Sequence, residues 1–165
     1  MAPYWRCLDG CLMLQQVLAN RPDSPPKDHL SPRCSNYLRE RGLSGGLIAT
    51  FDECAYAGDI QLGRLWLSAL GEIDRDNQLE ENRPCIEHGF LIVGSGLNGD
   101  LIALHIPSGK LAFISHDLLW EEDYEDFTEC VVQSPLGFEE FWIAAVEDRT
   151  FPVDSDDARE RWPSE

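Results

Sequence analysis

Apolar residues near the start of the chain recur at helical spacing. Between residues 7 and 19 they fall on one broad stripe, which predicts an amphipathic helix. Residues 20–32 carry several prolines and no periodic pattern, as is typical of a loop. A short helix is predicted over 32–41, because Pro32 suits a first helical turn and Gly42 suits the left-handed residue just past its end.

Short apolar runs follow, and they predict strands. The runs at 47–51 and 60–67 each predict one short strand. The polar segment between the second of these and residue 85 is a helix or a loop, for which Ser68 is the candidate N-cap.

The middle of the chain has the clearest strand pattern. A continuous apolar run covers residues 90–93, and two further runs at 101–106 and 110–115 predict a hairpin. Gly109 lies in the short connection between them and can adopt the positive φ that tight hairpin turns require.

The last third joins an acidic connector, residues 116–133, to helices. A helix is predicted over 134–148, with Ser134 as N-cap and Pro135 in the first helical position. Its apolar residues share one face: Phe138, Phe141, Trp142 and Ala145. The polar tail, 147–165, is predicted to hold a short helix capped by Asp154 or Ser155. Helices around a block of hairpin-linked strands predict a single α+β domain over 1–165, with a largely antiparallel central sheet flanked by helices.

The charge of the chain narrows the range of partners. The 165 residues contain 30 Asp and Glu against 13 Lys and Arg, a formal net charge of -17, and residues 111–165 alone carry a net charge of -13. A field of this sign repels phosphate backbones and anionic lipids and attracts basic partners. We therefore expect no direct nucleic-acid partner and no membrane. Simple solubility is the alternative explanation of the charge.

The remaining composition predicts a cytoplasmic protein. The first 20 residues lack the pattern of a secretory signal, and no apolar run is long enough to span a bilayer. The six cysteines are scattered without a CxxC pair, which predicts free thiols in a reducing compartment.

Residues 94–99 spell the GxGxxG pattern of dinucleotide-binding proteins, directly after a strand. The residues that follow are patterned as a strand, whereas a dinucleotide site needs a helix there. The segment is therefore predicted to be a structural glycine turn between two strands, with no cofactor. Its residues are Gly94, Gly96, Asn98, Gly99 and Asp100.

Catalytic and metal-ligating patterns are weak. The candidate metal ligands are loosely spaced, which predicts no metal site: Cys85, His88, His105, His116 and Asp117. No nucleophile elbow, phosphate loop or zinc-protease motif is present. A Cys–His pair that meets only in the folded chain stays open as an alternative.

One segment of the acidic connector combines three aromatic residues with five acids. Aromatic side chains anchor protein interfaces, and surrounding charges orient a charged partner. The segment is a candidate partner-binding site, and the alternative is a solvated connector whose Trp120 and Phe127 fold back into the core. The candidate residues are Trp120, Glu121, Glu122, Asp123, Tyr124, Glu125 and Asp126.

Four motifs between Gly89 and residue 146 occur in a recognisable order. They are the strand GFLIVGSG leading into Asn98-Gly99-Asp100, the strand and turn LIALHIPSGK, the triplet Ser115-His116-Asp117, and the aromatic segment SPLGFEEFWIAA. This ordered set, with Glu81-Asn82 before it, resembles the SUKH superfamily. That group joins Smi/Knr-type regulators of fungal cell-wall synthesis to many bacterial toxin-immunity proteins. The match is best over residues 81–146 and poor over 1–80.

The resemblance implies an α+β fold without catalytic activity, and bacterial members that bind and neutralise toxin domains, often nucleases. We therefore expect a non-catalytic immunity protein that binds a toxin domain with a basic surface. Two alternatives stay open: a regulatory scaffold that contacts a cellular enzyme, and a small enzyme with a Cys–His or nucleotide site.

Overall fold

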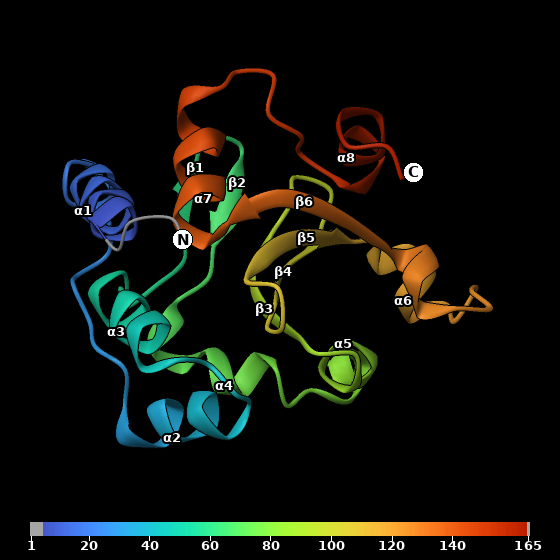
Figure 1. Ribbon diagram of the computed structural model, residues 1–165, viewed down its shortest axis with the longest axis horizontal. Helices are drawn as coiled ribbons and strands as arrows, with labels where there is room; N and C mark the ends of the chain where they lie inside the picture. Colours follow the sequence, from blue (N-terminus) through green and yellow to red (C-terminus); the bar gives the residue numbers. More distant parts are fainter. Residues whose placement is uncertain (1–4, 165) are drawn as a thin grey trace.

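The computed structural model describes the backbone of residues 5–164 and the side chains of residues 11–164. Its centre is a six-stranded antiparallel sheet in which every strand pairs with its neighbour in the sequence (Figure 1). This confirms the predicted α+β class and the antiparallel sheet. The strands are β1 Ile60–Leu62, β2 Leu65–Leu67, β3 Phe90–Ser95, β4 Leu101–His105, β5 Lys110–Ile114 and β6 Val131–Gly137.

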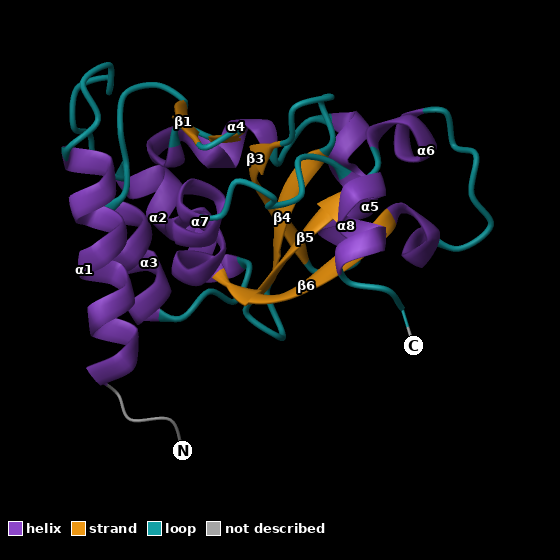
Figure 2. Ribbon diagram, turned by 90° about the horizontal axis from the view of Figure 1, so that it is seen from above, coloured by secondary structure: helices purple, strands orange, loops and turns teal. Residues whose placement is uncertain are grey.

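Helices cover both faces of the sheet (Figures 1 and 2). The α-helices in the described part of the chain are α1 Trp5–Ala19, α2 Pro32–Glu40, α3 Gly45–Glu53, α4 Ile73–Asp76, α5 Arg83–Glu87, α6 His116–Trp120, α7 Phe138–Glu147 and α8 Ser155–Arg161. Three short 3₁₀ turns complete the set: η1 Leu70–Glu72, η2 Glu80–Asn82 and η3 Phe127–Cys130. None of the helices in this range combines the length and the hydropathy needed to cross a bilayer.

Strand alternation divides the buried side chains into two cores. Leu91 and Val93 of β3 point into the larger core, and Phe90 and Ile92 point into the smaller one on the opposite face. The larger core lies under α1, α2, α3 and α7, and α1 packs directly against α7. The smaller core is closed by α5, α6 and η3.

The predicted strand at 47–51 is wrong, because this segment is helical. Ser44 is the N-cap of α3, and its hydroxyl accepts a hydrogen bond from the Leu47 amide at 3.2 Å. A cap of this kind satisfies an amide that has no partner inside the helix, so it favours a helix start over a strand. The predicted strand at 60–67 is two short strands, β1 and β2, which turn at Gly63 with φ 64°.

The predicted helix at 134–148 begins later than expected. Residues 134–137 belong to the edge strand β6, and Gly137 is the N-cap of α7. The assignments of Ser134 as cap and Pro135 as first helical residue are therefore wrong. The predicted apolar face is confirmed, since its four residues are all buried: Phe138, Phe141, Trp142 and Ala145.

The polar segment after β2 is a series of short helices: η1, α4, η2 and α5. Ser68 is not a helix cap, because η1 begins after Ala69, and the Ser68 amide donates to the Val93 carbonyl at 2.9 Å. The predicted tail helix is confirmed as α8, where the Asp154 carboxylate accepts from the Asp157 amide at 2.9 Å.

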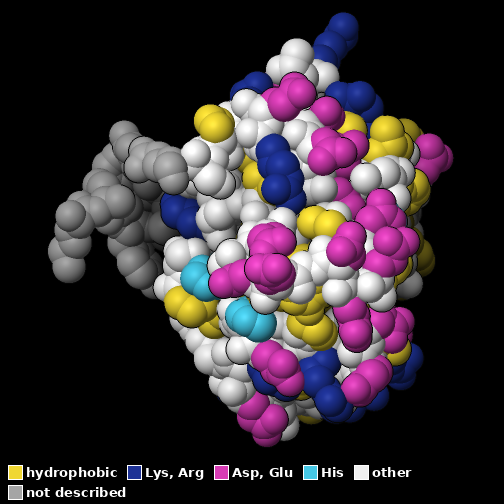
Figure 3. All heavy atoms as spheres, turned by 90° about the vertical axis from the view of Figure 1, so that its right-hand side faces the viewer, with side chains coloured by type: hydrophobic (Ala, Val, Ile, Leu, Met, Phe, Trp, Pro, Cys, Tyr) yellow, Lys and Arg dark blue, Asp and Glu magenta, His cyan; other side chains and the backbone are white. Residues whose placement is uncertain are grey.

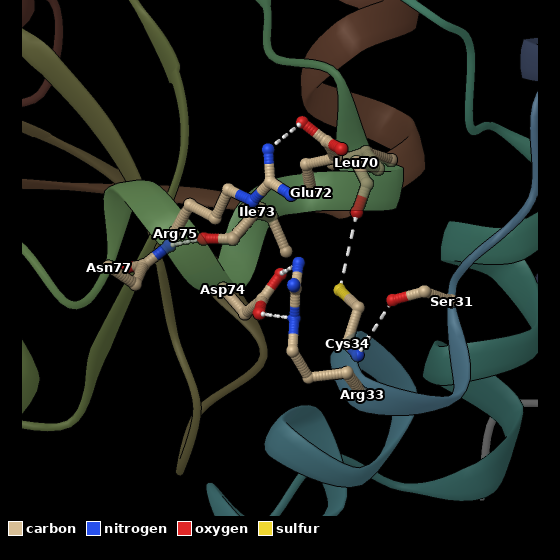
Figure 4. A network of polar contacts seen from close by, with 9 residues as sticks. All are labelled: Ser31, Arg33, Cys34, Leu70, Glu72, Ile73, Asp74, Arg75 and Asn77. Carbon is tan, nitrogen blue, oxygen red and sulfur yellow. Dashed lines mark hydrogen bonds and ion pairs between the residues drawn. The ribbon is translucent and has the colours of Figure 1, made fainter.

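An ion pair joins α2 to α4 (Figure 4). The Arg33 Nε atom lies 2.7 Å from Asp74 Oδ2, and the Asp74 side chain is only 1% exposed. A buried carboxylate is costly without a partner, so this pair stabilises the docking of α2. Beside it, Ser31 caps α2 by accepting from the Cys34 amide at 3.0 Å.

Candidate protein-interaction site

The glycine segment is a tight turn between β3 and β4. The Gly96 amide donates to the Asp100 carbonyl at 2.7 Å, and the Asp100 amide donates to Asn98 Oδ1 at 2.9 Å. Gly99 has φ 95°, a backbone conformation that residues other than glycine disfavour. The prediction that the segment joins two strands is confirmed. No helix follows it, so the turn lacks the helix N-terminus that a dinucleotide site uses.

Two glycines of the segment also allow close backbone approach. A Cβ at Gly94 would lie 2.3 Å from the Trp66 carbonyl oxygen and 2.7 Å from the Trp142 ring. A Cβ at Gly96 would lie 2.5 Å from the Val153 carbonyl oxygen. These positions therefore exclude any larger residue and let the turn pack against α7 and the segment before α8.

Asp100, the last residue of the turn, joins it to two helices. Oδ1 accepts from the His116 amide at 3.1 Å and from His116 Nδ1 at 2.7 Å, and Oδ2 accepts from the Ser155 amide at 2.8 Å. The residue is 1% exposed. Burial opposes its ionisation, but the hydrogen bonds from Ser155 and His116 outweigh that effect and hold the pKa of this carboxyl below its usual value. Asp100 is therefore a charged acceptor to which the first residues of α6 and α8 are both bound.

The His116 ring lies between two carboxylates. Its Nε2 atom is 3.1 Å from Asp117 Oδ1, on the side away from Asp100. The ring also meets Trp120 edge-on, with centroids 5.3 Å apart and planes at 68°. Gly99 lies beside this ring, since a Cβ at that position would be in van der Waals contact with it at 3.7 Å. The glycine turn thus contacts the start of the candidate partner-binding segment through one imidazole.

Residues 120–126 form a projecting turn, which we call the acidic tip. It extends from the end of α6, outside the layers of the sheet and its helices (Figures 1 and 2). Glu122 takes φ 54°, and the Asp123 amide returns to the Leu118 carbonyl at 3.1 Å, which closes the end of the helix. The five acids of the tip are all exposed: Glu121, Glu122, Asp123, Glu125 and Asp126. Among the described residues, none of the five takes part in an ion pair.

The aromatic residues around the tip divide into one exposed and two inward-facing side chains. Trp120 is 49% exposed, although its ring packs against that of His116. Phe127 is buried in the smaller core and stacks on His88, with centroids 4.1 Å apart. Tyr124 is half-buried against Phe127, and desolvation raises its pKa. The alternative interpretation of a connector folded into the core therefore holds for Phe127 and fails for Trp120.

Asp126 has a local structural role in addition to its charge. Its side chain accepts from the Thr128 amide at 2.9 Å and caps η3, and Glu129 accepts from the Asp126 amide in return. These hydrogen bonds from Thr128 lower the pKa of Asp126. Asp126 thus fixes the C-terminal end of the tip and is negatively charged.

The face around the tip is rich in acids. Figure 3 looks at the side of the molecule on which α6 lies, and Asp and Glu outnumber Lys and Arg there, with hydrophobic side chains between them. Two surface pockets of about 550 and 410 Å³ lie elsewhere, and each is lined in part by the β1–β2 hairpin. Neither is lined by a residue of the tip.

Burial raises the pKa of four of the five described cysteines, because it opposes formation of the thiolate. The five whose side chains are described are all free, and Cys7 lies outside that range. Burial raises the pKa of Cys54 and of Cys85 to about 12, whereas a nucleophilic cysteine needs a lowered pKa. The histidines, cysteines and acids of the described range form no group of three or more that could hold a metal ion.

Sequence reasoning placed Asp100 in a turn and missed its partners. The only signal was the order of motifs, Asn98-Gly99-Asp100 and then Ser115-His116-Asp117, which the fold brings together as neighbouring strand ends. No protein-family model matches the chain, and neither a curated protein nor a solved structure matches it. A function for this chain therefore has to be argued from the acidic tip and the residues that support it.

Proposed function

We propose that this protein is a non-catalytic binding protein that holds a basic partner protein at the acidic tip. The observation that carries the proposal is Trp120, a large aromatic residue that is 49% exposed on a projecting turn with five exposed acids. Exposed tryptophans are over-represented among residues that dominate binding energy in interfaces. An exposed tryptophan within a ring of like charges fits a site for a cationic surface.

The division of labour between these residues follows from their chemistry. Exposed charges at the rim of an interface mainly accelerate association with an oppositely charged partner. A buried aromatic anchor mainly slows dissociation. The acids of the tip are therefore expected to steer the partner, and Trp120 is expected to retain it.

The partner that we propose is a toxin domain, and the protein would act as its immunity protein. Surfaces that bind nucleic acid are basic, so a nuclease toxin would present the charge that the tip attracts. The motif order that resembles the SUKH superfamily supports the same proposal. The net charge of -17 strengthens the attraction at long range.

The test first requires that the partner be identified. Affinity capture from cells that carry the native locus should recover a basic protein with the wild-type chain as bait. Its association rate is then measured against a variant in which the five acids of the tip become amides: Glu121→Gln, Glu122→Gln, Asp123→Asn, Glu125→Gln and Asp126→Asn. Asn keeps the oxygen with which Asp126 caps η3. At low salt we expect association at least tenfold slower, which equals about 1.4 kcal/mol if dissociation is unchanged.

A matched control separates the tip from net charge. It changes five other exposed acids that make no ion pair in the described residues: Asp23, Glu40, Glu53, Glu140 and Glu147. This variant has the same net charge as the tip variant and should associate within about threefold of the wild type, because the charges it removes lie far from the tip. Trp120→Ala should instead speed dissociation. Equal rates for the wild type and the tip variant at low salt would refute the proposal, and capture of a cellular enzyme would favour a regulatory scaffold.

A further inference from the structure

We propose that Asp100 and His116 are positioning residues for the acidic tip, and that they hold Trp120 in the orientation in which it meets the partner. This inference rests on the proposed function for the purpose of the tip. Its structural part, the order that the two residues impose on Trp120, is independent of any partner.

Helix α6 is short and depends on its surroundings. The helix has five residues, and Trp120 is its last. Helices of this length are not stable by themselves in water, so α6 depends on contacts with the rest of the molecule. Only Leu119 is buried among its residues, and it packs in the smaller core.

Polar contacts at the first turn supply the rest. Asp100 accepts from the His116 amide, and the Ser115 hydroxyl accepts from the Leu118 amide at 3.4 Å. Asp100 is itself held by the Ser155 amide and by the glycine turn, both of which belong to the body of the protein. The carboxylate therefore connects α6 to a rigid support.

The imidazole of His116 carries this support to the indole. An ionised carboxylate only accepts, so the hydrogen bond of 2.7 Å places a proton on Nδ1 of His116. That bond restrains the orientation of the ring, which packs against the Trp120 ring with their planes at 68°. One side of the indole is thus held while the other is left for a partner.

Such an arrangement lowers the entropic cost of binding. A side chain that is already ordered loses less freedom when a partner covers it, so the interface is tighter for the same contacts. Without the ring, Trp120 would sample several rotamers at the end of a short, poorly supported helix.

The first test needs no partner. The {1H}–15N heteronuclear NOE of the Trp120 indole is measured in the wild type and in His116→Ala. We expect the wild-type indole to be as ordered as the amides of β4, and its NOE to fall by about half or more in the variant. The amide of Ser155 should not change. A mobile indole in the wild type, or an equally ordered one in His116→Ala, would overturn the inference.

Two further variants sharpen this result. His116→Asn can keep the hydrogen bond to Asp100 while it removes the ring, so it covers the case in which the alanine variant does not fold. Its indole should be as mobile as that of His116→Ala. His105→Ala is the matched control, because the His105 ring also packs on an aromatic ring, that of Phe90, with centroids 4.8 Å apart, but it makes no contact of this kind with Trp120. That variant should leave the Trp120 indole ordered.

The second test is a double-mutant cycle with the captured partner. His116→Asn should weaken binding about tenfold when Trp120 is present and less than twofold when it is Ala, because His116 is argued to act through the indole. An equal loss in both backgrounds would mean that His116 does not act through Trp120, and the inference would fail. If Trp120→Ala alone binds like the wild type, the proposed function fails, while the NOE result still decides the positioning of the indole.

Discussion

At the scale of single residues, Asp100 is the buried carboxylate that links the glycine turn to α6 and α8. Its two carboxylate oxygens accept three hydrogen bonds from two other segments of the chain. Asparagine at this position has one acceptor oxygen and one NH2 group. Its NH2 group would face at least one of these N–H donors and could not accept from it. Hydrogen bonds to charged groups contribute about 1.5–3 kcal/mol, so we expect Asp100→Asn to lower the free energy of unfolding at pH 7 by about 2–4 kcal/mol.

The pH dependence of that loss follows from the lowered pKa of Asp100. The unfolded carboxyl titrates at about 3.9, and the folded one at a lower pH. The stabilisation is therefore complete above the unfolded pKa and is lost as the pH falls through the folded pKa. Urea unfolding between about pH 7 and pH 2 should show a constant difference between wild type and Asp100→Asn down to about pH 5, and a shrinking one below about pH 4. A difference that shrinks as the pH rises would contradict this account.

At the scale of elements, Gly94 determines how closely β3 approaches β2 and α7. A Cβ there would meet the Trp66 carbonyl oxygen at 2.3 Å, and backbone cannot move aside cheaply. We expect Gly94→Ala to lower the free energy of unfolding by about 2–3 kcal/mol, as overpacked cores do. Gly45→Ala is the control, since nothing lies within 4 Å of a Cβ in that first turn of α3, and alanine should stabilise it by up to about 1 kcal/mol. Similar urea midpoints for the two variants would contradict the prediction.

The elements also show what the sequence could and could not predict. The strands from 90 to 114 were predictable because apolar runs and turn residues agree there. Residues 47–51 were not, since a short apolar run fits a strand or a buried helix equally well until Ser44 is known to cap it. Pro135 fits a first helical turn, but it is equally acceptable in an edge strand, where its missing N–H is not needed.

The candidate site was predictable only in part, for the same physical reason. The acids and aromatics of residues 120–126 are visible in the sequence, and their exposure follows from charge. The pairing of Asp100 with His116 depends on strands β4 and β5 lying side by side, a tertiary contact that no local pattern specifies. Which aromatic residue faces outward is decided by that same contact and by the burial of Phe127.

At the scale of the whole molecule, unpaired acids repel one another and oppose folding. The five-site tip variant removes five such charges, none of which forms an ion pair with another side chain of residues 11–164. We expect its Tm at low salt to equal or exceed that of the wild type, with a smaller rise on adding salt, because salt already screens the repulsion in the wild type. Thermal unfolding at about 0.01 M and about 1 M salt, where the Debye length is about 30 and 3 Å, measures both effects. A clear loss of Tm at low salt would show that the tip acids stabilise the fold.

The packing of α1 against α7 has a consequence during synthesis of the chain. Leu14 and Leu18 of α1 are fully buried in the larger core, but their cover includes a helix that starts about 120 residues later. A ribosome that adds about 5–20 residues per second would need roughly 6–24 s to produce it. For that interval the apolar stripe of α1 is exposed on a growing chain, where a chaperone can bind it. Completion of the fold therefore awaits the emergence of residues 138–147 from the ribosome.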